Sequence, residues 1–247
     1  MKTKLTLLLI SSALALVSCA GGSSSSAPSL DSSDPAGNIV TIDSTRDLID
    51  TYGGTIVKAS WLEGFVGDAL RFNGYDSHVI LPDHQDLRLT SEGTIGAFVY
   101  ADSHRPFAGI VHKGIAPDFS DEDYTFQFWG TDGTLVISLV NAEGQRLMLY
   151  SQKKVDAGRW YHVAATWNAD TVSLYIDGEP DASMPNTLGP ARGGSGPVII
   201  GAQLPVQYSQ SWGNLTLDGM LDEVFIQGEA MSPEMVRSYY QNIIQSR

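Results

Sequence analysis

The chain has 247 residues, 43% of them hydrophobic and 17% charged, and its formal net charge at pH 7 is −13. Such an acidic surface repels phosphate backbones, so nucleic acid and bare anionic lipid are disfavoured as partners, whereas divalent cations are favoured. Cys19 is the single cysteine, which excludes an internal disulfide and a cysteine zinc site.

The N-terminus has the organisation of a secretion signal. Lys2 and Lys4 precede LTLLLISSALALVS, an apolar stretch too short to span a bilayer. The stretch ends in LVSC, residues 16–19, which resembles the lipobox of bacterial lipoproteins. The resemblance implies that residues 1–18 are removed and that Cys19 carries the lipid anchor. An ordinary cleaved signal with an incidental cysteine is the alternative.

The segment after the cysteine is predicted to be a flexible tether. Residues 19–37 are rich in Gly, Ser and Pro and show no apolar repeat. Residues 38–247 are long enough for one domain with a complete core. Ala20 is not the aspartate that typically retains lipoproteins at the inner membrane, so the expected location is the bacterial cell envelope, at the outer membrane if the cell has one.

Short strands separated by turn signals fill this domain. Residues 68–82 give a strand, the Asn73-Gly74 turn and a second strand, and the turns Asp132-Gly133 and Glu143-Gly144 divide residues 124–151 into three strands. Further strands are expected at 93–102, 108–114, 160–167, 172–176, 197–202 and 219–228. Turns at a spacing of about 8–12 residues predict an all-β fold, an antiparallel two-sheet jelly-roll sandwich.

The segment GRWYHVAATWNADTVSLYIDG, residues 158–178, is the clearest hairpin. Its first strand alternates between two sets of side chains, and His162 shares a face with Trp160. No Ser, Cys or acid is fixed beside His162 by the sequence. We therefore interpret it as a structural histidine, hydrogen-bonded within the sandwich, and not as a catalytic one.

A single helix is predicted, at the C-terminus. Ser232 can cap it, Pro233 suits the first helical position, and Glu234 complements the positive end of the helix dipole. Apolar residues then follow at helical spacing, which favours packing against a sheet over a partner site. They are Met235, Val236, Tyr239, Tyr240, Ile243 and Ile244.

Four segments together resemble the laminin-G-like, concanavalin A-like lectin/glucanase family. They are GFVGDALRFNGYDSHVILP, TIGAFVYAD, the hairpin at 158–178 and LDGMLDEVFIQGEAMSPEMV, in the family's order and over roughly residues 50–240. The resemblance implies one concave and one convex antiparallel sheet. It implies little about function, because this scaffold supports lectins, adhesion modules, hydrolases and spacers.

The sequence does not favour catalysis. Glucanases with this scaffold need two carboxylates on one strand face, in a Glu-x-Asp-x-Glu pattern or a near variant. The nearest string starts at Glu179-Pro180-Asp181, lacks the second Glu and contains a proline, and Asp222-Glu223 should point to opposite faces. We expect no enzyme activity, with a polysaccharide hydrolase as the weakest hypothesis.

The resemblance also implies a possible structural calcium ion between an N-terminal aspartate and the closing strand. The similar positions are Asp50 and Asp222, where turn capping and a sheet-end hydrogen bond are the alternatives. A second acidic cluster, Asp118, Asp121, Glu122 and Asp123, lacks EF-hand spacing and is expected to be a solvated loop.

Sugar binding requires an aromatic platform beside polar side chains. Tyr208, Trp212 and Asn214 form one candidate set, and His104, Arg105 and Phe107 form another. Trp129 ends a strand whose Gln127 faces the same side. We therefore predict a non-catalytic, lectin-like lipoprotein domain that binds a glycan or a surface partner. The alternative is a structural or adhesion module that binds another envelope protein.

Overall fold

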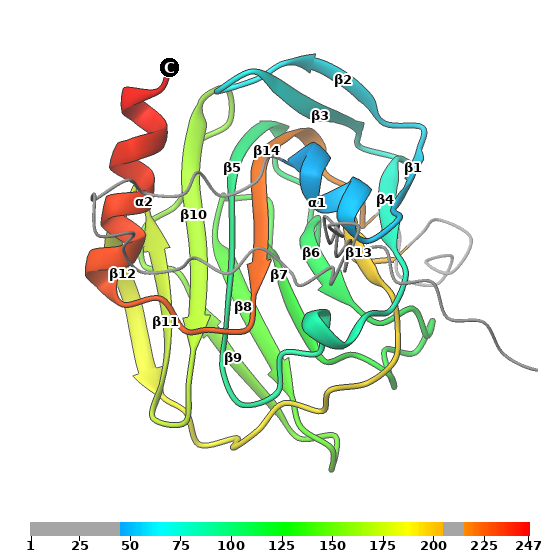
Figure 1. The fold of residues 1–247 in the computed structure, drawn as a ribbon, viewed down its shortest axis with the longest axis vertical. Helices are drawn as coiled ribbons and strands as arrows, with labels where there is room; N and C mark the ends of the chain where they lie inside the picture. Colours follow the sequence, from blue (N-terminus) through cyan, green and yellow to red (C-terminus); the bar gives the residue numbers. More distant parts are fainter. Residues whose placement is uncertain (1–44, 205–214) are drawn as a thin grey trace, which may run out of the picture.

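The computed structural model describes residues 45–204 and 215–247. Within them, the strands form two seven-stranded antiparallel sheets that face each other (Figure 1). The predicted antiparallel jelly-roll sandwich is confirmed. Neither helix of the described part combines the length and the apolar character needed to cross a bilayer.

We call the first sheet sheet A. Its strands are, in spatial order, β1 (Thr55–Val57), β4 (His78–Leu81), β13 (Val198–Ile200), β6 (Gly109–Lys113), β7 (Tyr124–Phe128), β8 (Leu135–Val140) and β9 (Arg146–Tyr150). The second sheet, sheet B, runs through β12 (Glu179–Pro185), β11 (Thr171–Ile176), β10 (Trp160–Trp167), β5 (Gly93–Ser103), β14 (Asp218–Gln227), β3 (Asp68–Asn73) and β2 (Ser60–Glu63).

The core fills the space between the sheets, as strand alternation predicts. On β10, Tyr161, Val163 and Trp167 belong to the inter-sheet core, whereas Trp160 and Ala164 lie on the other face. The same alternation on β9 places Leu147 and Leu149 in the core. Local period-two patterning therefore decides which side chains each strand buries.

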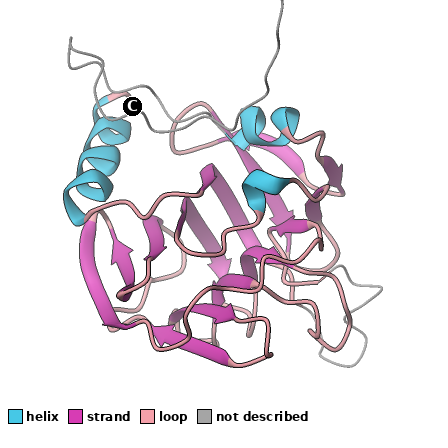
Figure 2. Ribbon diagram, turned by 60° about the horizontal axis from the view of Figure 1, so that its bottom comes forward, coloured by secondary structure: helices cyan, strands magenta, loops and turns pink. Residues whose placement is uncertain are grey.

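Helix α2 (Pro233–Gln245) covers the outer face of sheet B (Figures 1 and 2). Its start is as predicted: the Ser232 Oγ accepts the Met235 N–H at 3.3 Å, and Pro233 opens the helix. Val236, Tyr239 and Ile243 are buried against the sheet.

His162 lies in this layer between sheet B and α2. Its ring centroid is 5.2 Å from that of Phe98 and 5.5 Å from that of Tyr239. The ring is fully buried, and neither nitrogen has a hydrogen-bond partner among residues 45–204 and 215–247. The structural role is consistent with this position, but the expected hydrogen bonds within the sandwich were wrong, because aromatic rings surround the imidazole.

The turn at Asn73-Gly74 connects the two sheets and does not form a hairpin. The strands on either side of Asn73-Gly74 do not pair with each other, since β3 joins sheet B and β4 joins sheet A. Asn73 Oδ1 accepts the backbone N–H groups of Tyr75 and Asp76, which turns the chain from one sheet to the other.

Several elements had no clear sequence signal. They are α1 (Thr45–Thr51), the 3₁₀ turn η1 (Gln85–Leu87), β1, β2 and β12. Strand β12 was hidden because Pro180 and Pro185 interrupt a strand pattern, and prolines are tolerated there because β12 is an edge strand.

Candidate functional site

Three aromatic side chains meet at one end of sheet A. Trp129 follows β7, Tyr150 ends β9, and Phe107 lies in the loop between β5 and β6. The ring centroid of Trp129 is 5.0 Å from that of Phe107 and 5.3 Å from that of Tyr150, both in edge-to-face contact. Trp129 and Tyr150 are 38% and 39% exposed. We call these three residues the aromatic face.

The strand pattern explains why these rings point outward. Phe128 and Leu149 fill the core, so the next residues, Trp129 and Tyr150, lie on the outer side of sheet A. The Trp129 N–H donates to the Thr134 carbonyl at 2.9 Å, which closes the β7–β8 connection and fixes the start of the Trp129 side chain.

Phe107 adopts an unusual backbone conformation. The Ala108 N–H donates to the Arg105 carbonyl at 3.2 Å, which makes residues 105–108 a β-turn with Phe107 in its third position. There φ is +60°, a region where turns normally carry glycine and where a bulky side chain is strained. Such strain persists at positions that the surrounding structure holds for another reason, and functional sites are enriched in it.

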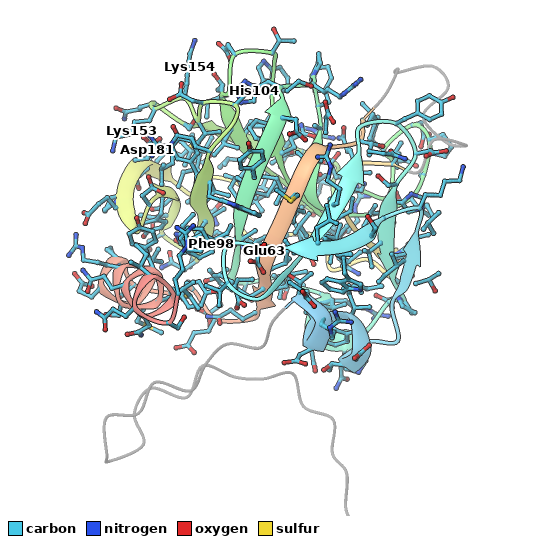
Figure 3. The ribbon with its side chains drawn as sticks, turned by 90° about the horizontal axis from the view of Figure 1, so that it is seen from above. Glu63, Phe98, His104, Lys153, Lys154 and Asp181 are labelled. Carbon is cyan, nitrogen blue, oxygen red and sulfur yellow. The ribbon has the colours of Figure 1, made fainter. Side chains whose placement is uncertain are left out.

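The segment after Tyr150 is held by both sheets. From β12, Asp181 accepts the backbone N–H groups of Gln152 at 2.7 Å and Lys153 at 3.0 Å. From sheet A, the Leu135 N–H donates to the Ser151 Oγ at 2.9 Å. Figure 3 shows Lys153 beside Asp181. These hydrogen bonds hold residues 151–153, which directly follow Tyr150, against both sheets.

Positively and negatively charged side chains both lie near the aromatic face. Lys154 pairs with Asp132, and the bond from Lys154 together with that from Thr134 holds the pKa of Asp132 well below its usual range. His104, on the same side of the molecule (Figure 3), packs against Phe128 with ring centroids 5.2 Å apart. Burial lowers the pKa of His104, against the opposing effect of Asp132, so the ring is neutral at pH 7.

The predicted residues are thus brought together in part. Phe107 and Trp129 touch, and His104 packs against Phe128, the residue before Trp129. Gln127 faces the same side as Trp129 but is only 3% exposed, and its Oε1 has no hydrogen-bond partner in the part of the chain that the structure describes. Sequence reasoning missed Tyr150, although its place at the end of an alternating strand is the same signal that pointed to Trp129.

The acidic segment before β7 is not a solvated loop throughout, which corrects the sequence prediction. Glu122 and Asp123 are each 1% exposed. Glu122 Oε1 accepts from Thr125 Oγ1 and Ser138 Oγ, both at 3.0 Å, and from Arg146 Nη1 at 2.6 Å. The carboxylate is buried because strands β7, β8 and β9 supply these donors, which lie far apart in sequence.

A groove of about 360 Å³ runs beside β9, at the edge of the sandwich where β9 and β12 lie next to each other. One residue that lines it is Arg146, whose guanidinium donates a hydrogen bond to the carboxylate of Glu122. Its walls are Gln145, Arg146, Leu147, Met148, Met184, Thr187 and Leu188.

The residues proposed for calcium are engaged differently. Asp50 is exposed in α1, whereas Asp222 is fully buried in β14. The Asp222 Oδ2 accepts the Val66 N–H and Oδ1 accepts the Glu223 N–H, both at 2.9 Å, and burial raises its pKa against these bonds. Over residues 45–204 and 215–247, no three His, Cys, Asp or Glu side chains are grouped to hold a metal ion. A structural calcium ion at Asp50 and Asp222 stays a prediction.

The carboxylates nearest to a hydrolase pattern also have structural partners. Arg237 donates to both oxygens of Glu179, at 2.9 and 2.7 Å, and so joins α2 to β12. Asp181 accepts two backbone N–H groups, as described above. Tyr208, Trp212, Asn214 and Cys19 lie outside the described residues, so their predicted roles stay predictions.

A family model identifies the same fold as the structure. Residues 73–237 match the model of the concanavalin A-like lectin/glucanases superfamily. The chain belongs to this superfamily. No curated protein sequence matches it.

Solved structures with the same fold include binding domains. The binding domain of Paraclostridial Mosquitocidal Protein 1 superimposes with a TM-score of 0.62 at 16% identity, covering 78% of this chain and 48% of that one. Domain 4 of AbnA, an extracellular arabinanase of Geobacillus stearothermophilus, in complex with arabinotriose, gives 0.59 at 20% identity, covering 76% and 88%.

A third similar structure is the ligand-binding domain of botulinum neurotoxin serotype D in complex with N-acetylneuraminic acid. It gives a TM-score of 0.57 at 12% identity, covering 76% of this chain and 45% of that one. The superfamily member described here therefore spans about half the length of the toxin binding domains that it matches. At these identities the similarity concerns the fold.

Proposed function

We propose that this superfamily member is a non-catalytic, lectin-like domain that binds glycan through the aromatic face, at the surface of a bacterial envelope to which Cys19 anchors it. The observation that carries the proposal is the contact of Trp129 with both Phe107 and Tyr150 at one end of sheet A, where Trp129 and Tyr150 are exposed and Phe107 is half-buried. Sugar rings present C–H faces that stack on aromatic rings, while their hydroxyl groups bond to nearby polar side chains.

Two further observations support binding over catalysis. Glu179, Asp181 and Asp222, the candidate carboxylates, bond to a guanidinium or to backbone N–H groups. Two of the similar structures are complexes with sugars, arabinotriose and N-acetylneuraminic acid, and the toxin structures are named as binding domains. These similarities support a sugar as the ligand of this chain.

The central test replaces Trp129 with alanine. The mature chain, purified in detergent, is applied to a glycan array, and the affinity for each sugar bound is measured by isothermal titration calorimetry. Because Trp129 contacts both other rings, Trp129→Ala should weaken binding at least about tenfold, or about 1.4 kcal/mol. Calcium is included and omitted to test the calcium prediction separately.

Trp61→Ala is the matched control. Trp61 lies on β2, at the far edge of sheet B, where the guanidinium of Arg46 stacks 4.1 Å from its ring centroid. Trp61→Ala should leave binding unchanged. If Trp212→Ala abolishes binding and Trp129→Ala does not, the site belongs to residues 208–214. If no sugar binds under any condition, the glycan hypothesis fails and an envelope protein becomes the favoured partner.

A further inference from the structure

The groove beside β9 and the aromatic face are continuous. Arg146, Met148 and Tyr150 alternate with core residues, so all three lie on the outer side of the same strand. The Tyr150 hydroxyl lies 3.6 Å from the Met148 sulfur, and Met148 is a wall of the groove. An unbroken series of contacts therefore leads from Phe107 through Trp129 and Tyr150 to the groove.

The combined surface is long. Arg146 and Tyr150 are about 13 Å apart along the strand, because each residue advances the chain by about 3.3 Å. Beyond Tyr150, the centroids of Trp129 and Phe107 follow at steps of 5.3 and 5.0 Å. These two steps run across the end of sheet A, from β9 toward β6, so the contact points follow a path that turns at Tyr150, and a single sugar ring can occupy only one of them.

The groove has walls suited to a sugar. Leu147, Met148, Met184 and Leu188 provide apolar surface, and Gln145, Arg146 and Thr187 provide groups that can bond to hydroxyls. Its volume of about 360 Å³ is in the range of small-molecule sites.

Arg146 is the polar group that the fold holds most firmly. Its Nη1 donates to Glu122 Oε1 and, at 2.9 Å, to Ser138 Oγ, while its side chain remains 38% exposed. Nε and Nη2 make no hydrogen bond within the described part of the chain, so they can serve hydroxyl groups. Glu122 balances the positive charge of Arg146, and the chain carries a net charge of −13, so an anionic sugar gains nothing here.

We propose that the aromatic face and the groove between β9 and β12 form one elongated site for an extended neutral oligosaccharide. The aromatic face binds one part of the chain, and the groove, with Arg146, binds sugar units farther along it. This inference rests on the proposed glycan-binding function and gives it a ligand class: the interior of a neutral polysaccharide.

The experiment measures how affinity depends on ligand length. The mature chain in detergent is titrated with arabino-, xylo- and cello-oligosaccharides, each from the disaccharide to the hexasaccharide, and with oligogalacturonates as anionic counterparts. In the neutral series that binds, the hexasaccharide should bind at least about tenfold more tightly than the disaccharide, about 1.4 kcal/mol. Oligogalacturonates of equal length should bind more weakly.

Two variants assign the gain to the groove. Thr187→Trp fills the groove from its exposed wall, and Arg146→Gln replaces the guanidinium, with its free Nε and Nη2, by a shorter amide; each should reduce hexasaccharide affinity to that of the disaccharide. Thr55→Trp, at an exposed position on the opposite edge strand of sheet A, is the matched control and should change neither. Thermal melting verifies that each variant is folded.

The outcomes separate the two proposals. If Trp129→Ala abolishes binding but affinity does not increase with length, or Thr187→Trp leaves the increase intact, the elongated site is wrong and glycan binding stands. If only oligogalacturonates bind, the neutral ligand class is wrong. If no oligosaccharide binds, or Trp129→Ala changes no affinity, both proposals fall.

Discussion

At the scale of single residues, Phe107 is the most informative position. Its φ of +60° places a bulky side chain where glycine is normally found, and its ring contacts Trp129. A glycine in that turn would relieve strain of about 1 kcal/mol or more, while the loss of the ring contact would cost about 0.5–1.5 kcal/mol. These effects act in opposite directions, and the apolar area of the half-buried ring adds to the second, so the turn itself does not require a phenylalanine here.

Phe107→Gly should therefore separate binding from stability. The free energy of unfolding, measured by chemical denaturation, should stay within about 1 kcal/mol of the wild type. Affinity for the sugar identified on the array should fall at least about tenfold, or about 1.4 kcal/mol. A large loss of stability with full retention of binding would assign Phe107 a purely structural role.

At the scale of secondary-structure elements, α2 turns the outer face of sheet B into a second buried layer. Phe98, Tyr175 and Phe225 from the sheet meet Val236 and Tyr239 from the helix in one apolar cluster. The imidazole of His162 is enclosed by this layer, and burial lowers its pKa to about 3. The helix therefore excludes water from the imidazole of His162, which is neutral in the folded protein at pH 7.

This burial predicts a loss of stability in acid. The unfolded chain protonates His162 near pH 6.5, but the folded chain does so only near pH 3. Between these values the unfolded state binds more protons, so stability falls as the pH falls, by the order of 1–2 kcal/mol at pH 5 from this residue. His162→Leu should flatten this part of the pH profile of unfolding.

The control for His162→Leu is a substitution on the side of α2 that faces away from His162. Ser238 is exposed on α2, so Ser238→Ala should keep the wild-type dependence on pH. An unchanged acid profile in His162→Leu would show that the imidazole is solvated in solution and that α2 does not seal the layer.

At the scale of the whole molecule, the chain joins an acidic domain to a predicted anchor. The Gly- and Ser-rich segment 19–37 predicts a tether that lets the domain move relative to the membrane. A net charge of −13 disfavours contact with anionic lipid, so the predicted membrane attachment relies on the N-terminal anchor.

Cys19→Ala tests this arrangement. Wild-type protein expressed with an alkyne-labelled fatty acid should incorporate the label and enter the detergent phase, because acyl chains supply the anchor. Cys19→Ala should lose the label completely, whereas Ser23→Ala in the tether should retain it. Labelled Cys19→Ala protein would place the lipid elsewhere, and an unlabelled wild type would favour an ordinary cleaved signal.

Much of the fold was predictable because its signals are local. The alternation at 160–167 specified which side chains of β10 face the core, and Ser232 and Pro233 specified the start of α2. The candidate site was only partly predictable. Trp129 and Phe107 could be proposed from their strand and loop positions, but their contact with each other and with Tyr150 joins three separate connections.

The sequence by itself determined most of the strands and turns, the C-terminal helix and the two-layer class, because side-chain periodicity and backbone capping act over a few residues. Only the tertiary structure decided that β3 and β4 belong to different sheets, that Glu122 is buried beneath Arg146, and that an aromatic face continues into a groove. These features depend on which strands become neighbours, and that choice is made by packing between segments far apart in the chain.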